Sequence, residues 1–92
     1  MSKILVVCGN GLGSSFIIEM NVKKALNELG IEAEVSHTDL TTAKSEQADY
    51  YIGSSEILEN LEDGQRHVIK LSNIMDKAEL KNALETNISK ED

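Results

Sequence analysis

The part of the sequence that decides the fold is an apolar run joined to a glycine-rich segment, Ile4-Leu5-Val6-Val7-Cys8-Gly9-Asn10-Gly11-Leu12-Gly13-Ser14-Ser15. The five apolar residues 4–8 predict a β-strand that is covered on both faces, as in a parallel sheet. The glycines predict a loop, and Ser14 or Ser15 can cap a following helix. The chain therefore begins with a strand, a loop and a helix.

The helix after the loop is expected to run to about Leu29 and to bury one face. Gly30 supplies a stop signal at its end. Five apolar residues fall on one side at helical spacing, which predicts the side that packs on the sheet. They are Ile18, Val22, Ala25, Leu26 and Leu29.

The remainder of the chain repeats the alternation of strands and helices. Strands are expected at 32–37, 49–53 and 67–71, and helices at 39 or 41 to 46, 54 or 55 to 61, and 76–88. Asp63-Gly64 predicts a turn, and 89–92 a frayed tail of a single domain spanning 1–92.

This pattern predicts an α/β fold. The sheet is expected to be open, parallel and four-stranded, with order 2-1-3-4 and right-handed crossovers, in a doubly wound, flavodoxin-like (Rossmann-like) three-layer α/β/α arrangement. Ligands of such sheets bind beyond the carboxyl ends of the strands, at the switch point between strands 1 and 3. Cys8 ends the first strand, so the single thiol is expected at the binding edge.

Composition excludes several classes of function. The net charge is -7, from 16 acidic and 9 basic residues, which disfavours nucleic acid and anionic membranes as partners. Residues 1–30 carry a balance of +1, so the region of Cys8 is the part least repulsive to an anion. No apolar run is long enough to span a membrane, and one cysteine with two histidines predicts neither a disulfide nor a metal site. We expect a cytoplasmic protein with a free thiol and no cofactor.

The residues around Cys8 suit the binding of a phosphoryl group. Glycines let backbone N–H groups turn inward around an anion, and a helix N-terminus adds partial positive charge. A thiolate is a nucleophile, and its phosphorylated form needs several hydrogen-bond donors. The proposed phosphate-binding loop is Gly9, Asn10, Gly11, Leu12, Gly13, Ser14 and Ser15. An inert buried thiol beside an ordinary strand-to-helix turn is the alternative.

Related phosphate-binding motifs do not match. A Walker A loop requires Lys-Ser/Thr after its last glycine, and a dinucleotide fingerprint requires one more residue than Gly9 to Gly13 provides. Small tyrosine phosphatases place an arginine where this chain has Ser14, and the only arginine, Arg66, is expected at the opposite edge of the sheet. Hydrolysis should therefore be poor. A stand-alone phosphatase-like or thiol enzyme that uses Cys8 remains the alternative function, beside a module that only senses an anion.

The segment Cys8 to Ser15, followed by Phe16-Ile17-Ile18-Glu19-Met20-Asn21-Val22, resembles the IIB proteins of bacterial sugar phosphotransferase systems. The resemblance is closest to the ascorbate-type branch of the lactose/ascorbate/galactitol-like IIB proteins and is densest over residues 3–26. In that family a cysteine takes a phosphoryl group from a phosphohistidine of the IIA protein and passes it to a substrate bound by the membrane component IIC.

The resemblance implies that this chain is a phosphotransferase with Cys8 as the phosphorylated residue and 9–15 as its loop. It also implies IIA and IIC as partners, peripheral association with the membrane through IIC, and no insertion of its own. L-ascorbate is the implied substrate, with a related sugar or polyol left open.

Other polar residues have weaker signals. His37 is expected to end the second strand, and with Asp39 it could complete a Cys/His/Asp hydrolase, although a surface or loop-capping histidine is the simpler interpretation. Ser54 or Ser55 could touch the phosphate, or only cap a helix. His67 is expected at the wrong end of the sheet.

A possible docking surface comes from helix geometry. Relative to Ile18, the side chains of Phe16 and Met20 point away from the sheet, and Lys23 lies farther along the same outward face. These three residues are expected to form an apolar patch with a basic edge that binds IIA and IIC. The alternative is that Phe16 is covered by a neighbouring loop.

Overall fold

The computed structural model describes residues 2–8, 13–62, 64 and 66–88. Four strands form one parallel sheet, β1 (Ser2–Cys8), β2 (Ala33–Asp39), β3 (Tyr50–Ser54) and β4 (Val68–Leu71). Their order is β2-β1-β3-β4, which confirms the predicted doubly wound topology and places the switch point between β1 and β3.

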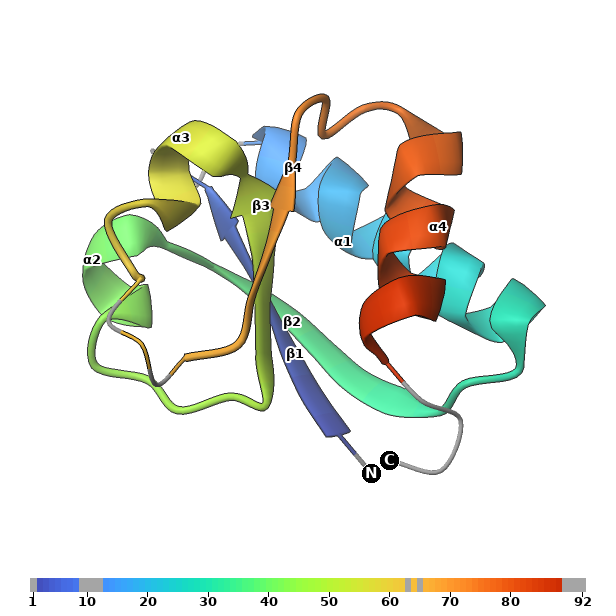
Figure 1. The fold of residues 1–92 in the computed structure, drawn as a ribbon, viewed down its shortest axis with the longest axis horizontal. Coiled ribbons are helices and arrows are strands. Elements are labelled where there is room, and N and C mark those ends of the chain that lie inside the picture. Colours follow the sequence, from blue (N-terminus) through green and yellow to red (C-terminus); the bar gives the residue numbers. More distant parts are fainter. Residues whose placement is uncertain (1, 9–12, 63, 65, 89–92) are drawn as a thin grey trace.

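Helices cover both faces of the sheet, as Figure 1 shows. The long helices α1 (Gly13–Leu29) and α4 (Lys77–Asn87) lie side by side on one face. The short helices α2 (Leu40–Ala43) and α3 (Ser55–Leu58) lie on the other. The three-layer arrangement predicted from the sequence is confirmed.

The central strand β1 has a core on each side. Ile4, Val6 and Cys8 belong to the core between the sheet and helices α1 and α4, whereas Leu5 and Val7 belong to the core under α2 and α3. Successive side chains of a strand point to opposite faces, so a continuous apolar run is what a doubly covered strand needs. The predicted inner face of α1 is also confirmed, since Ile18 and Val22 are fully buried.

Several predicted ends of strands are wrong by one or two residues. The first strand, predicted at 4–8, begins at Ser2, and the strand predicted at 49–53 is β3, Tyr50–Ser54. The strand predicted at 32–37 is β2, which continues to Asp39 because its backbone pairs with β1 as far as Cys8. His37 therefore lies within β2, opposite Val6. The strand predicted at 67–71 begins at Val68, so His67 precedes β4.

The two middle helices are shorter than predicted, since α2 ends at Ala43 and α3 at Leu58. After each helix the chain continues in turns, in which an N–H binds the carbonyl three residues back, as Ser45 does with Thr42 and Asn60 with Ile57. The predicted cap at Asp39 is confirmed by a hydrogen bond from the Thr42 N–H to its carboxylate. Gly30 has a φ of 73°, the left-handed conformation expected of a helix stop. The predicted tail at 89–92 lies outside the described residues.

Candidate functional site

Cys8 is the last residue of β1, at the carboxyl edge of the sheet and at the switch point. Its thiol is free and only 5% exposed, and it packs in the core beneath α1 and α4. On β2, its register partner is Asp39. The structure therefore brings the single thiol to the edge where ligands of this fold bind.

A close approach between β3 and β1 lies beside Cys8. A Cβ atom added at Gly53 of β3 would come within 2.5 Å of the Val7 carbonyl oxygen of β1, and within 3.8 Å of a Leu58 side-chain carbon. Any side chain at position 53 would force the backbones of β3 and β1 apart, because the closest of these contacts is with a main-chain atom. The absence of a side chain at Gly53 thus allows β3 to approach β1 closely at Val7, the residue before Cys8.

Most of the predicted phosphate-binding loop, Gly9 to Leu12, lies outside the described residues. Gly13 is the first residue of α1, so the helix begins five positions after Cys8. The predicted cap at Ser14 or Ser15 is therefore wrong, because both positions lie inside the helix. A helix N-terminus carries unpaired backbone N–H groups and partial positive charge. Helix α1 is the next element after β1, and its N-terminus lies at the same end of the sheet as the carboxyl end of β1 (Figure 1).

A buried carboxylate links α1 to β2, which the sequence analysis did not predict. Glu19 is only 8% exposed. Its carboxylate binds the Lys23 ammonium at 2.8 Å and the Nδ1 atom of His37. The hydrogen bond from Lys23 lowers the pKa of Glu19 most, the bond from His37 lowers it further, and burial acts in the opposite direction. The i, i+4 spacing of Glu19 and Lys23 could have predicted their ion pair from the sequence. The contact of Glu19 with His37 could not be predicted, because it depends on the register of β2 against β1.

The carboxylate that orients His37 is thus Glu19, where the sequence had suggested Asp39. The Asp39 carboxylate instead accepts the backbone N–H of Thr42 at 2.7 Å, and this bond lowers its pKa. The Cys/His/Asp hydrolase considered in the sequence analysis is therefore wrong in its acid, because Glu19 and not Asp39 contacts His37.

Three large apolar side chains at the start of α1 are exposed, and we call Phe16, Ile17 and Met20 the apolar patch. Their exposed fractions are 56%, 45% and 53%. Phe16 also meets the His37 ring edge to face, with centroids 6.4 Å apart. Phe16 and Met20 were predicted to point outward, and the structure confirms this; Ile17 was missed. Lys23, predicted at the basic edge, is exposed and paired with Glu19.

The two serines after β3 differ in their contacts. Ser54 is the N-cap residue of α3, but its side chain makes no capping hydrogen bond. The Ser55 hydroxyl donates to the carbonyl of Leu71 at 3.4 Å. Neither hydroxyl therefore caps α3. Ser54 is the last residue of β3, the strand next to β1.

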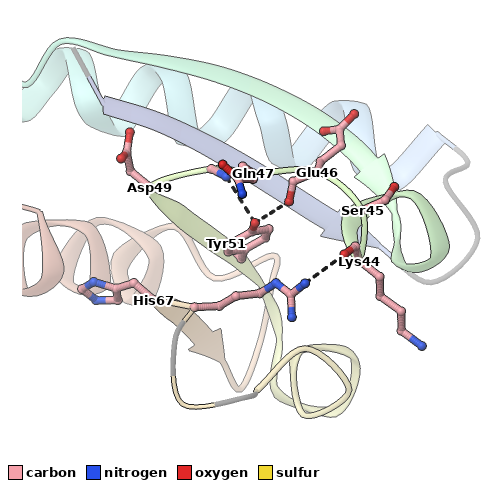
Figure 2. Close-up of a pocket in the computed structure, with 9 residues that line it drawn as sticks. Lys44, Ser45, Glu46, Gln47, Asp49, Tyr51 and His67 are labelled. Atoms are coloured by element: carbon pink, nitrogen blue, oxygen red, sulfur yellow. Dashed lines mark hydrogen bonds between the residues drawn. The ribbon is translucent and has the colours of Figure 1, made fainter.

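A pocket of about 450 Å³ opens at the opposite edge of the sheet, before β3 and β4 (Figure 2). Its polar groups bind the protein itself. The Tyr51 hydroxyl donates to the carbonyl of Glu46 at 2.6 Å, and the Arg66 guanidinium donates to the carbonyl of Lys44 at 2.9 Å. The Arg66 hydrogen bond connects the segment before β3 to the segment before β4. The guanidinium thus lies at the edge of the sheet opposite Cys8, as predicted.

His67 belongs to the same distal edge. Its ring lies 4.6 Å from that of Tyr50, and its Nε2 atom is 3.1 Å from the side-chain oxygen of Asn87. These contacts are structural, in agreement with the sequence analysis. Among the described residues, no helix combines the length and apolar character needed to cross a membrane.

Comparison with known proteins gives a consistent result. Residues 3–86 match the family described as the lactose/cellobiose-specific IIB subunit of the phosphotransferase system. An ascorbate-specific EIIB component of Mycoplasma pneumoniae is 32% identical over 84 residues, which covers 88% of each chain. Ascorbate-specific EIIB components of Salmonella choleraesuis and Escherichia coli O157:H7 are each 35% identical over 80 residues, covering 84% of this chain and 79% of theirs.

The family match runs from within β1 to within α4, so it concerns the whole fold rather than the glycine-rich segment alone. Members of this family are phosphotransferases that work between a IIA and a IIC component. On this combined basis, the chain belongs to the IIB subunits of the phosphotransferase system.

Proposed function

We propose that this IIB protein carries a phosphoryl group on Cys8 between a IIA donor and a IIC acceptor. The observation that carries the proposal is the position of the single thiol, at the end of β1 and at the switch point of the sheet. That position is where a parallel α/β sheet receives its ligands.

The chemistry needs one nucleophile and no water. The Cys8 thiolate attacks the phosphorus of a phosphohistidine on IIA, the S–P bond forms, and the N–P bond breaks with its electron pair staying on the imidazole nitrogen. In the second half, a hydroxyl of the substrate attacks the same phosphorus, and the O–P bond forms. The S–P bond breaks with its electron pair staying on sulfur, and the hydroxyl proton is released to solvent. Cys8 itself is only 5% exposed, so the residue that would carry the phosphoryl group has little contact with water.

The segment from Gly9 to Ser15 is proposed as the cradle of the phosphoryl group. Glycine backbone can present several N–H groups to one anion, and the N-terminus of α1 adds to the positive potential. The Ser54 hydroxyl is a further candidate donor from β3. A stand-alone phosphatase is not favoured, since the only guanidinium, on Arg66, is bound to Lys44 at the distal edge.

The apolar patch is proposed as the docking surface for the partners, with Lys23 at its basic edge. Its residues stand on the first two turns of α1, next to the helix end that follows Cys8. A phosphoryl group can pass without hydrolysis only when two proteins exclude water around it, and exposed apolar side chains do this.

Replacing both Phe16 and Met20 with Ser is expected to weaken transfer from phosphorylated IIA by about 10-fold or more, because two central apolar contacts of an interface are lost. The fold should be retained, since both side chains are more than half exposed. Stopped-flow or quench-flow transfer at several IIA concentrations measures the effect, which should appear as weaker binding.

Met75→Ser provides a matched control. Met75 is 52% exposed and lies in the segment between β4 and α4, outside the apolar patch. Equal losses in both variants, or none in either, would show that docking does not depend on this patch.

L-ascorbate is the proposed substrate, supported by the named specificity of the relatives. Reconstitution of the protein with IIA and with membranes that contain the ascorbate-type IIC tests this. Phosphorylated ascorbate is expected, with lactose, cellobiose and galactitol giving background levels in their own IIC membranes. Phosphorylation of one of those sugars and not of ascorbate would move the protein to another branch of the family. The same proposal places the protein in the cytoplasm, attached to the membrane through IIC.

A further inference from the structure

A histidine held by a buried carboxylate stands next to the proposed phosphorylation site. Cys8 and His37 lie on adjacent strands, where Cys8 pairs with Asp39 and His37 with Val6. The offset of two residues gives about 8 Å between their Cα atoms, from a strand spacing of about 4.8 Å and a rise of about 3.3 Å per residue. Diagonal neighbours of this kind are within reach of long and aromatic side chains.

Both side chains also face the same layer. Cys8 packs in the core beneath α1, and His37 contacts two residues of α1, Glu19 and Phe16. The imidazole is thus on the same side of the sheet as the sulfur and beside the start of α1. A phosphoryl group on Cys8 would enter the space that this helix, β1 and β2 share.

The contacts of the ring leave one nitrogen available. Glu19 engages Nδ1, so the carboxylate fixes the ring's orientation and favours a proton on that nitrogen. Among the described residues, no hydrogen bond reaches Nε2, and the side chain is 40% exposed. When the ring is protonated, Nε2 becomes a donor with a positive charge behind it.

The charges that face His37 favour that donor once a phosphoryl group arrives. Helix α1 contributes Glu19 and Lys23, and β1 contributes Cys8. The nearest carboxylate of β2 itself, on Asp39, is engaged by the Thr42 N–H at the start of α2. Helix α2, which also packs on β2, has no charged side chain. With a neutral imidazole, Glu19 and Lys23 cancel each other, and no net positive charge faces a phosphoryl dianion. Protonation of His37 supplies that positive charge.

We propose that His37, oriented by Glu19, contacts the phosphoryl group on Cys8 and stabilises it by donating a hydrogen bond from Nε2 of the imidazolium. The inference rests on the proposed function of Cys8 and adds a residue to that site. No proton is transferred in this contact. Glu19 is a positioning residue that acts through His37.

Histidine signals in NMR spectra test the contact in the unmodified protein, because the chain has only two histidines, His37 and His67. Imidazole resonances are recorded between pH 5 and 8 before and after phosphorylation by phosphorylated IIA. On phosphorylation, the His37 resonances are expected to move toward their imidazolium positions at neutral pH. The His67 resonances, at the distal edge, should stay in place.

Variants test the consequence for transfer. His37→Gln is expected to slow phosphoryl transfer from IIA to Cys8 by about 10-fold, the effect of losing one hydrogen bond to a charged group. It should also remove the part of the pH dependence between about pH 5 and 8 that histidine causes. Glu19→Gln should slow transfer less and keep that pH dependence, and His67→Gln should change neither.

The outcomes separate the two proposals. If Cys8 accepts no phosphoryl group at all, the proposed function fails. If Cys8 is phosphorylated but the His37 resonances move no more than those of His67, the contact is overturned, whatever the stability of the variants. Equal pH dependence in the parent protein and in folded His37→Gln would overturn it as well.

Discussion

Cys8→Ser is expected to abolish phosphoryl transfer, lowering the rate from IIA by at least about a thousandfold, as loss of a nucleophile does in hydrolases. Serine is close to cysteine in size, but its hydroxyl ionises far less readily than a thiol. The measurement is formation of phosphorylated substrate in the reconstituted IIA, IIB and IIC system.

A second variant separates chemistry from folding. The hydroxyl introduced by Cys8→Ser would enter a mostly apolar environment, at a cost of about 1 kcal/mol, so a small fall in melting temperature is expected. Cys8→Ala avoids this polar group and should be equally inactive. Transfer by either folded variant at a rate near that of the parent protein would contradict a phosphocysteine.

Gly53→Ala is expected to lower the free energy of unfolding by about 2 kcal/mol, because its Cβ would overlap the Val7 carbonyl and the two strands cannot both keep their positions. The distance of 2.5 Å to a main-chain oxygen leaves no flexible side chain to absorb the clash. In a domain of this size the melting temperature should fall by about 8 to 16 °C, measured by thermal unfolding followed by circular dichroism.

Ser54→Ala is the control for this variant on the same strand. The Ser54 side chain makes no capping hydrogen bond, so its loss should change stability by less than about 0.5 kcal/mol. If Gly53→Ala is as stable as Ser54→Ala, a side chain fits between β3 and β1, and the close approach at Gly53 is wrong.

The arrangement of the sheet was predictable because its signals are local and strong. The continuous apolar run before Cys8 predicted a central strand, and the spacing from Ile18 to Leu29 predicted the buried side of α1. With four strands and short links, the rules of chain crossover leave few topologies, and the observed order is among them. The place of Cys8 at the carboxyl edge followed from its position at the end of the first strand, and its place at the switch point followed from the strand order.

The Glu19–His37 pair was not predictable in the same way. It depends on the register of β2 against β1, which continues to Asp39, and on the rotation of α1 above both strands. Glu19 occupies the buried side of α1 beside Ile18, a place where a sequence pattern predicts an apolar side chain. Similarly, the exposure of Ile17 and the close approach at Gly53 depend on contacts between elements that are distant in sequence.

Mass spectrometry of the phosphorylated protein tests the central claim most directly. The protein is incubated with phosphorylated IIA, digested at a pH at which phosphocysteine persists, and fragmented so that modified residues are located. One phosphoryl group is expected on the peptide that contains Cys8, on the cysteine itself, and it should disappear when excess unphosphorylated IIA is added. A phosphoryl group on His37 or a serine instead, or an unmodified Cys8 with active IIA, would contradict the account.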